Sequence, residues 1–512
     1  MKKNIIFIFG LSVIVAISSC SKKLDLAPVS SISDANFWQT PDQVDAFVSG
    51  LHNRFRSNIG AFQSLGEMRA DIFGTDPGSS SAFTGEATQG VERLWTNNLD
   101  LDNPGVSNYG GFYSNINQIN LLISKLNSGV VPLPDVTKNY YLGIAYGMRA
   151  FYYFHIYRSW GQAIIQTEPT TSFDISNLAK AASPETDVMK LIKDDIDKSL
   201  TAFGSDYSFK NQKAYWSKAA TLMLKAEVYL WTSYRGGGAA DATIAKTALT
   251  NIQTNVPGLS LLPSFANVFA SNNKGNSEII FAIRNKLDEA QLPFASTFFP
   301  QTSLIVNYYD SVGNRKFNVT ADNWGGLLRA PVMISTFRRY DDRDSRKWAT
   351  ITAAYNLVSG SYKIAGAFVS KYQGEQTPSG RQYTNDFPIY RYADLLLMLA
   401  EAKVILGESP ATEINAVRQR AYGANYDAAT LGYPNQPVDA DPKEAILQER
   451  FFEFIFEGKR WYDLRRMDAS GAYVFKYTTV PSSQAYKLLW PVDRNTLTNN
   501  RSLEQTSGYP KF

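Results

Sequence analysis

Apolar residues recur at helical spacing in eight segments of this chain, and this pattern constrains the fold more than any other feature. The segments are residues 41–57, 112–127, 138–158, 184–203, 214–234, 241–254, 390–406 and 442–467. A helix with one apolar face must bury that face against another element, so the pattern predicts a mainly α fold. The consecutive segments between 138 and 254 have the size of stacked helical hairpins, which favours a superhelix of the tetratricopeptide type.

A capping residue followed by proline marks the expected start of four helices. The four pairs are Thr40–Pro41, Ser183–Pro184, Ser409–Pro410 and Asp441–Pro442. Proline suits the first helical position because the N–H that it lacks would have no partner there. Gln43 and Glu444 stand three positions after Thr40 and Asp441, where each is expected to complete a capping box.

Two long stretches, residues 58–106 and 256–387, lack this periodicity and are rich in glycine, asparagine and other loop-forming residues. The second stretch contains two strand-like runs, Ile279–Ile283 and Leu304–Tyr309. Both stretches also contain tryptophan, which disordered chains lack. We therefore expect ordered loops on a helical scaffold, which is where binding residues usually lie.

The first twenty residues have the organisation of a secretory signal. Two lysines precede an apolar run, Ile5–Ala16, which is shorter than the ~20 residues of a membrane-spanning helix. Small residues then lead to Cys20, the only cysteine in the chain. Residues 17–20 (ISSC) resemble the lipobox of bacterial lipoproteins. We expect a signal peptide at 1–19, lipidation of Cys20, and an anchor and tether at 20–39.

The residue types that most catalytic and metal sites need are scarce. His52 and His155 are the two histidines, both in expected helices, and no second cysteine accompanies Cys20. Cys/His zinc sites and Cys–His catalysis therefore have no candidate residues, and no Walker A or G-x-G-x-x-G sequence indicates a nucleotide. The balance of 51 Lys and Arg against 47 Asp and Glu argues against a nucleic-acid partner. We expect no cofactor, no metal and no enzymatic activity.

A secreted glycoside hydrolase is the alternative, because its paired carboxylates are defined by their separation in space and leave no mark in the sequence. The most obvious acids are Glu449, Glu453 and Glu457, which recur every four residues among basic residues of the segment 442–467. This spacing is typical of a helix face with ion pairs inside one segment.

Two tryptophans stand beside side chains of the kind that bind sugar hydroxyls. Trp95 is followed by Asn97, and Trp324 is preceded by Asp322 and Asn323. An exposed ring offers a flat apolar face to the C–H face of a sugar, whereas the competing place for each ring is the core. We predict that Trp95 and Trp324 converge as a stacking platform. The candidate flanking contacts are Asp71, Asn97, Tyr308 and Tyr309.

The C-terminal third contains several distinctive runs. They are Phe387–Gly407 (FPIYRYADLLLMLAEAKVILG), Ile414–Tyr422 (INAVRQRAY), Ile446–Met467 (ILQERFFEFIFEGKRWYDLRRM), Trp490–Pro491 and Leu503–Tyr509 (LEQTSGY). The helix Met148–Gly161 (MRAFYYFHIYRSWG) and the N-terminal cysteine agree with the same pattern. In their order along the chain and in their residues, these runs resemble the SusD/RagB family of outer-membrane nutrient-binding lipoproteins.

The resemblance implies a right-handed superhelix of four tetratricopeptide-like helix pairs, with an irregular, ligand-facing loop region packed on it. A single domain, 40–512, would hold the scaffold at 40–57, 107–255 and 388–467, the ligand-facing segments at 58–106 and 256–387, and a tail at 468–512. Five residues of the motifs would join helices rather than bind ligand. They are Glu449, Glu453, Arg460, Trp461 and Asp463.

The resemblance also implies a place and a partner. The protein would be lipid-anchored in the outer membrane and would face the cell exterior. It would bind an oligosaccharide, or in some members a peptide, and deliver it to a TonB-dependent transporter resembling SusC. Ligand positions in this family lie in variable loops, so no ligand residue is carried over from the motifs.

Overall fold

The structure, a computed structural model, describes residues 37–75, 89–170, 179–310, 312 and 314–512. The expected signal peptide (1–19), Cys20 and the first part of the tether lie outside the described residues. None of the helices in the described part of the chain is long and apolar enough to cross a membrane.

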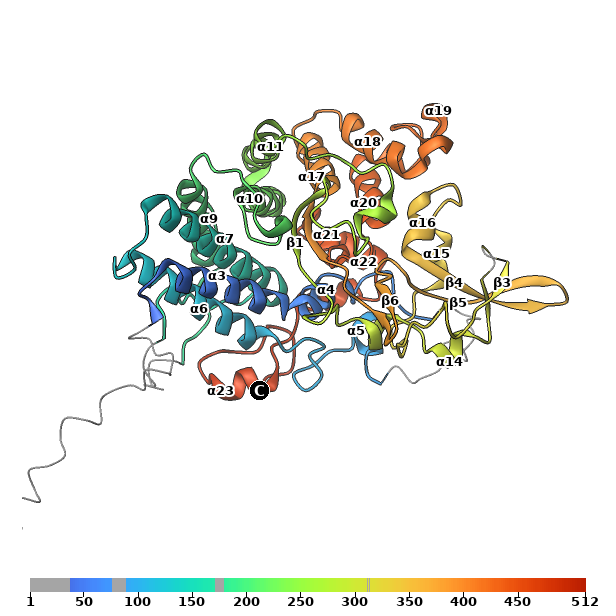
Figure 1. Cartoon of the computed structure of the whole chain (residues 1–512), viewed down its shortest axis with the longest axis horizontal. Helices are drawn as coiled ribbons and strands as arrows, with labels where there is room; N and C mark the ends of the chain where they lie inside the picture. Colours follow the sequence, from blue (N-terminus) through green and yellow to red (C-terminus); the bar gives the residue numbers. More distant parts are fainter. Residues whose placement is uncertain (1–36, 76–88, 171–178, 311, 313) are drawn as a thin grey trace, which may run out of the picture.

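A row of packed helices forms most of the molecule (Figure 1). Its members are α3 (Pro41–Arg56), α6 (Tyr109–Asn127), α7 (Asp135–Trp160), α9 (Glu185–Phe203), α10 (Lys218–Thr232), α11 (Gly238–Asn255), α17 (Tyr392–Ile405), α18 (Ala411–Tyr422) and α20 (Pro442–Phe454). Each helix packs on the next, from α3 against α6 to α17 against both α18 and α20. The mainly α class predicted from the apolar spacing is confirmed.

Two of the four expected helix starts carry a side-chain cap. Thr40 and Gln43 bond to each other's backbone N–H groups at the start of α3, so this capping box is confirmed. Asp441 caps α20, but the Glu444 carboxylate binds residues of the C-terminal tail instead of the Asp441 backbone. The prediction of a second capping box is therefore wrong. At α9 and α18 the proline itself is the N-cap, and its side chain cannot form a capping hydrogen bond.

The segment 442–467, predicted as one helix, is two helices, α20 and α21 (Arg460–Arg466), so that prediction is wrong. Between them Phe456 and Gly458 take left-handed conformations, with φ of +70° and +71°. Glu67, at the end of α4 (Ile59–Glu67), holds this turn by accepting the N–H groups of Phe456 (2.6 Å) and Gly458 (3.1 Å). A Cβ on Gly66 would lie 1.7 Å from the Gly458 carbonyl oxygen, so glycine permits this close approach.

The stretch 256–387, expected to contain two strands among loops, contains more strands than that. β1 (Ile279–Ile283) pairs antiparallel with β8 (Phe387–Arg391), which confirms the strand predicted at 279–283. A second sheet, in the order β3-β2-β4-β5, lies at the opposite end of the molecule from α9 (Figure 1). Its strands are β2 (Tyr309–Asp310), β3 (Arg315–Lys316), β4 (Ile351–Val358) and β5 (Ser361–Val369), and β6 (Glu375–Thr377) with β7 (Gly380–Gln382) forms a separate hairpin. The strand predicted at 304–309 is wrong, because the run begins at the end of α14 (Thr302–Ile305), continues as a turn over 306–308 and reaches β2 only at Tyr309.

Short helices complete the chain. They are α5 (Glu92–Trp95), α12 (Phe265–Val268), α13 (Ala295–Phe298), α15 (Ile334–Arg338), α16 (Ser345–Thr350), α19 (Ala428–Leu431), α22 (Ala472–Tyr477) and α23 (Arg494–Asn499), with one-turn segments η1 (Asn211–Lys213), η2 (Ser233–Gly237), η3 (Gly423–Asn425), η4 (Pro437–Ala440) and η5 (Ser482–Leu488). The helix α4 lies in the stretch 58–106, which was expected to be irregular, and it buries Ile59, Phe62 and Leu65. That part of the prediction is therefore wrong.

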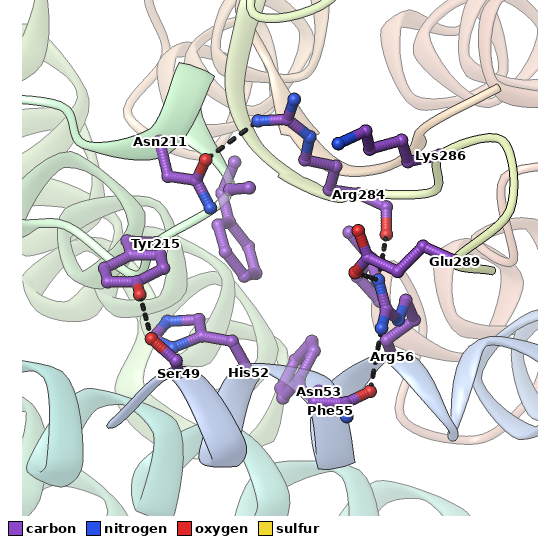
Figure 2. Close-up of a pocket in the computed structure, with 13 residues that line it drawn as sticks. Ser49, His52, Asn53, Phe55, Arg56, Asn211, Tyr215, Arg284, Lys286 and Glu289 are labelled. Carbon is purple, nitrogen blue, oxygen red and sulfur yellow. Dashed lines mark hydrogen bonds and ion pairs between the residues drawn. The ribbon is translucent and has the colours of Figure 1, made fainter. Parts of the chain in front are cut away.

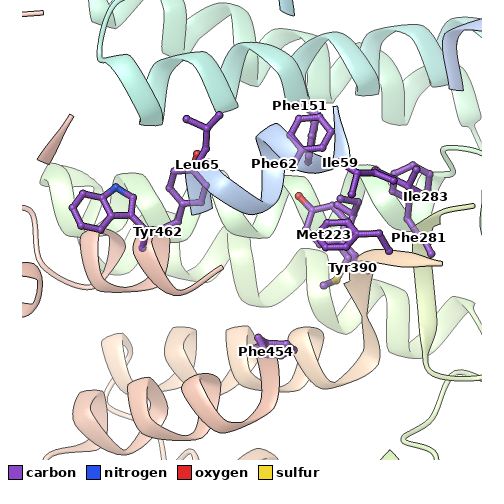
Figure 3. Close-up of a cluster of buried hydrophobic side chains, with 14 of the residues drawn as sticks. Ile59, Phe62, Leu65, Phe151, Met223, Phe281, Ile283, Tyr390, Phe454 and Tyr462 are labelled. Carbon is purple, nitrogen blue, oxygen red and sulfur yellow. The ribbon is translucent and has the colours of Figure 1, made fainter. Parts of the chain in front are cut away.

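Side chains from both halves of the chain meet in one core (Figure 3). Phe151 of α7 contacts Phe62 of α4 at 5.5 Å between ring centroids and Trp216 at 5.6 Å. Trp216 in turn contacts Phe281 of β1 at 5.1 Å. Trp461 of α21 is fully buried, as its motif role predicted. The core thus joins the helical row to β1 and to the C-terminal helices.

A cluster of buried ion pairs, the ionic cluster, surrounds α20. Glu449, Glu453 and Glu457 pair with other elements and not with basic residues of their own segment, so the within-segment prediction is wrong. Their partners are Arg346 of α16, Lys371, Arg391 of β8, and Arg418 and Arg420 of α18. The predicted role of Glu449 and Glu453 in joining helices is confirmed.

Candidate ligand-binding site

Trp324, predicted as half of a stacking platform, is a core residue. Only 7% of it is exposed, and its ring contacts Phe299 at 5.6 Å and Phe368 at 5.2 Å. The Arg381 guanidinium lies 4.4 Å from the ring centroid, and the Tyr383 hydroxyl donates to the Trp324 carbonyl. The ring therefore has little free face for a sugar, and the competing interpretation holds for it.

Asp71 and Asn97 use their polar atoms inside the protein. The Asp71 carboxylate binds Arg460 at 2.8 Å and Arg339 at 2.7 Å. Burial opposes ionisation there, but these two guanidinium groups prevail and lower the pKa of Asp71 to about 2. Asn97 is buried and accepts from Arg69 at 2.7 Å. Both side chains hold segments distant in sequence together.

The remaining predicted residues lie apart in the fold. Trp95 is half-buried beside Gly74, and its carbonyl accepts from the Thr479 hydroxyl. Tyr308 is buried, whereas Tyr309 is half-buried beside Tyr362 at 5.9 Å. Among the ring contacts of the described residues, none joins Trp95 to Trp324. Ligand contact by any of the six residues stays a prediction.

A cavity of about 320 Å³ opens between α3, the turn η1 and the strand β1 (Figure 2). We call it the cationic cavity. Its lining residues are Ser49, His52, Asn53, Phe55, Arg56, Asn211, Ala214, Tyr215, Phe281, Ile283, Arg284, Lys286 and Glu289. Phe55 and Phe281 belong to the core beneath it, so the cavity has an apolar floor and polar walls.

The first wall comes from one face of α3. Ser49, His52, Asn53 and Arg56 follow at spacings of three, one and three residues, which places them together beside the buried stripe of the helix. The Ser49 hydroxyl pairs with the Tyr215 hydroxyl across the cavity edge. This wall therefore presents hydroxyl and amide groups, with the Arg56 guanidinium at the end of the helix.

His52 is locked in its neutral form. Its Nδ1–H donates to the Val48 carbonyl at 2.8 Å, and its Nε2 accepts the Trp216 N–H at 3.0 Å. The ring stacks on Tyr215 at 4.4 Å with an interplanar angle of 7°. Desolvation lowers its pKa to about 4. At neutral pH, His52 is thus a rigid part of the wall and carries no charge.

The residues after β1 form the opposite wall, which is basic and is joined to the α3 wall by Arg56. Arg56 donates to Glu289 at 2.6 Å and to the Arg284 carbonyl at 3.3 Å. Arg284 donates to the Asn211 side-chain oxygen at 2.8 Å, and Lys286 is exposed beside it. The pKa of Glu289 is lowered chiefly by the hydrogen bond from Arg56. The charges of Arg56, Lys286 and Arg284 lower it further. Three cations and one carboxylate therefore line the cavity, and Arg56 alone pairs with that carboxylate.

The turn that carries Asn211 is strained. Asn211, Gln212 and Lys213 have φ of +49°, +52° and +65°, a left-handed run that costs non-glycine residues roughly 1–2 kcal/mol each. Lys213 holds the turn by donating to the Asn276 carbonyl at 2.6 Å, and burial lowers the pKa of that lysine to about 8. The turn aims the Asn211 side chain at Arg284.

Comparisons with known proteins give the family. A model of the SusD family matches residues 343–509. The structure of B. fragilis NanU is 47% identical, covers 95% of this chain and 100% of its own, and superposes with a TM-score of 0.87. A SusD superfamily protein from Bacteroides vulgatus is 42% identical, with 92% and 100% of the two chains covered and a TM-score of 0.85. The chain belongs to the SusD family.

Further relatives extend over the same length. The SusD-like protein P38 of Formosa agariphila is 26% identical over 99% of this chain and 99% of its own. A surface glycan-binding protein A from Bacteroides thetaiotaomicron shares the fold, with a TM-score of 0.68 at 18% identity over 92% of this chain and 100% of its own.

The motifs of the SusD family and the cationic cavity occupy different parts of this chain. Residues 343–509 contain α20, α21 and most of the ionic cluster. Every residue that lines the cavity lies before residue 290, outside that range. Sequence reasoning missed the cavity, although the polar residues at helical spacing on α3 were a signal that could have marked one wall.

Two other hollows differ from the cationic cavity in the charge of their linings. One of about 660 Å³ runs along α11, but its threonines donate to carbonyls of their own helix, as Thr247 does to Thr243 at 2.8 Å. Its charges also pair, because Lys246 binds Glu408 at 2.6 Å. The other, of about 280 Å³ against Tyr109 and Tyr113, has one lysine among neutral side chains.

Proposed function

We propose that this chain is a cell-surface lipoprotein that binds a nutrient oligosaccharide and delivers it to a TonB-dependent outer-membrane transporter resembling SusC. The observation that carries the proposal is the likeness to SusD superfamily structures along nearly the whole chain, with 95% of it covered at 47% identity. A protein of this kind acts by binding and transfer, so we propose no catalytic step.

The glycan part of the proposal is supported by relatives of the same fold. One structural relative is a surface glycan-binding protein in complex with laminarihexaose. The cationic cavity of this chain offers hydroxyl and amide groups over an apolar floor, which are the groups that recognise a sugar ring. Trp95 and Tyr309, both partly exposed, stay candidate contacts for a longer glycan.

The binding step is tested by calorimetry on the soluble chain that follows Cys20. We expect at least one oligosaccharide from a panel of plant, microbial and host glycans to bind, and the glycan to be recovered intact. Binding of peptides alone would replace the glycan proposal with the peptide-binding alternative. Cleavage of a bound glycan into shorter products would favour the hydrolase alternative.

The anchor and the partner are tested in cells. Cys20→Ala should release the protein from the membrane fraction, whereas Ser18→Ala keeps the thiol and should leave the protein attached. Affinity purification of the anchored protein from outer membranes should recover a large TonB-dependent transporter. A Cys20→Ala protein that stays in the membrane fraction would contradict the lipid anchor.

A further inference from the structure

The residues that line the cationic cavity carry more positive than negative charge. Glu289 is its one acid, and that carboxylate already binds Arg56. Among the ion pairs of the described residues, none involves Arg284 or Lys286. A concave site lined by one sign of charge concentrates ligands of the opposite sign. The cavity is therefore suited to an anion.

Arg284 is held in place before any ligand arrives. Its carbonyl accepts from Arg56 at 3.3 Å, and one end of its guanidinium donates to Asn211 at 2.8 Å. A guanidinium has five N–H donors, so the bond to Asn211 leaves others that can reach a carboxylate. A fixed guanidinium loses little side-chain entropy on binding, which favours affinity.

The strained turn η1 is part of this arrangement. Three successive left-handed residues persist only where the surrounding structure holds them, and such strain gathers at functional sites. Here the strained residue Asn211 is the one that positions Arg284.

The other wall and the size of the cavity describe the rest of the ligand. Ser49, Asn53 and Tyr215 offer hydroxyl and amide groups across from Arg284 (Figure 2). The flat stack of His52 on Tyr215 is uncharged and rigid. A volume of about 320 Å³ is near the lower end of the ~300–1,000 Å³ typical of ligand pockets. The ligand is then small and rich in hydroxyl groups.

We infer that the cationic cavity binds a small hydroxylated carboxylate, either a free acidic sugar or the acidic end of a glycan. Its carboxylate lies against Arg284 and Lys286, and its hydroxyls face Ser49 and Tyr215. The inference rests on the proposed function, because it names the chemical class of the nutrient and the site that selects it.

The test is calorimetry on the soluble chain with acidic sugars and their neutral counterparts. The acidic probes are D-glucuronate, D-galacturonate and N-acetylneuraminate, and their neutral counterparts are D-glucose, D-galactose and N-acetylmannosamine, respectively. A further probe is an oligosaccharide that ends in the acidic sugar found to bind. We expect one acidic sugar to bind, and we expect its affinity to fall as salt is added, because salt screens the attraction between the charges. Tighter binding of the oligosaccharide than of the free sugar would identify the glycan end as the ligand.

Charge-removing variants locate the carboxylate. Arg284→Gln and Lys286→Gln should each weaken the acidic sugar roughly ten- to hundredfold, the loss expected for a hydrogen bond to a charged group. Ser49→Ala should weaken it only about two- to tenfold, because it removes a neutral hydrogen bond. The matched controls are Arg338→Gln and Lys363→Gln, which remove exposed cations outside the cavity and should change nothing.

The outcomes separate this inference from the proposed function. Neutral glycans that bind while all acidic sugars fail would overturn the inference and leave the proposed function standing. Acidic sugars that bind all cavity variants as tightly as the wild type would place the site elsewhere and also overturn it. Peptides that bind while no sugar does would overturn both. Circular dichroism on each variant shows that a lost affinity is not a lost fold.

Discussion

Charged side chains differ in burial and in pairing between two regions of this molecule, the ionic cluster around α20 and the cationic cavity beside α3. In the cluster, Arg391 is fully buried and binds three carboxylates, those of Glu278 at 2.7 Å, Glu453 at 2.6 Å and Glu457 at 2.9 Å. Burial of a guanidinium is costly, and only such close partners offset it. These charges therefore serve to join elements.

In the cavity, the cations outnumber their partners. Arg284 is partly exposed and Lys286 is exposed, and the one acid that lines the cavity, Glu289, binds Arg56. Water solvates such groups, so the fold does not depend on pairing them. The recognisable motifs of the SusD family therefore describe how the scaffold is held, whereas the inferred ligand site consists of residues outside the matched range 343–509.

The largest effect should follow from breaking the ionic cluster. Glu453 binds Arg346, Arg391 and Arg420, and these guanidinium groups hold its pKa below the usual range against the desolvation that burial imposes. Glu453→Gln leaves buried cations short of a carboxylate, which should cost about 3–5 kcal/mol of the free energy of unfolding. Urea denaturation measures this loss. An unchanged midpoint would show that the cluster does not support the fold.

The pKa of His52 tests whether the cavity wall is rigid. Desolvation lowers its pKa to about 4 from an ordinary 6.5. The unfolded chain takes up that proton near pH 6.5 and the folded protein does not, so stability should fall by about 3 kcal/mol as pH drops from 6.5 to 4. NMR titration of the two histidines, assigned with His52→Gln, gives the pKa. A midpoint near 6.5 would indicate a solvated, movable ring.

The smallest effect should come from a paired but exposed charge. Lys246 and Glu408 lie 2.6 Å apart, with 34% and 42% of their side chains exposed. Solvent screening leaves such a pair worth about 0–1 kcal/mol, so Glu408→Gln should hardly move the urea midpoint. A loss as large as that of Glu453→Gln would mean that pairing, and not burial, distinguishes the two regions.

Much of the scaffold could be predicted from the sequence because helices leave a local signal. The apolar stripe of α3, its Thr40 cap and the strand β1 were predicted within one or two residues. The break between α20 and α21 could not be predicted, because it depends on the approach of Gly458 to Gly66, almost four hundred residues earlier. A local pattern carries no information about such a contact.

The site was harder to predict than the scaffold. A tryptophan beside Asp or Asn indicates a sugar platform or a core position equally well, and Trp324 proved to be core. The cationic cavity joins α3, η1 and the residues after β1, which lie far apart in the sequence and meet only in the folded chain, where β1 packs against both α3 and η1. Arg284 and Lys286 stand in a segment without periodicity, so no local pattern marks their place beside Asn211.

The most direct test of this account measures unfolding free energy and ligand affinity together on Arg284→Gln. If the cavity cations serve a ligand, the variant should unfold within about 0.5 kcal/mol of the wild type and lose roughly ten- to hundredfold in affinity for an acidic sugar. A variant that is destabilised as strongly as Glu453→Gln, with its affinity unchanged, would contradict the account and make Arg284 one more structural charge.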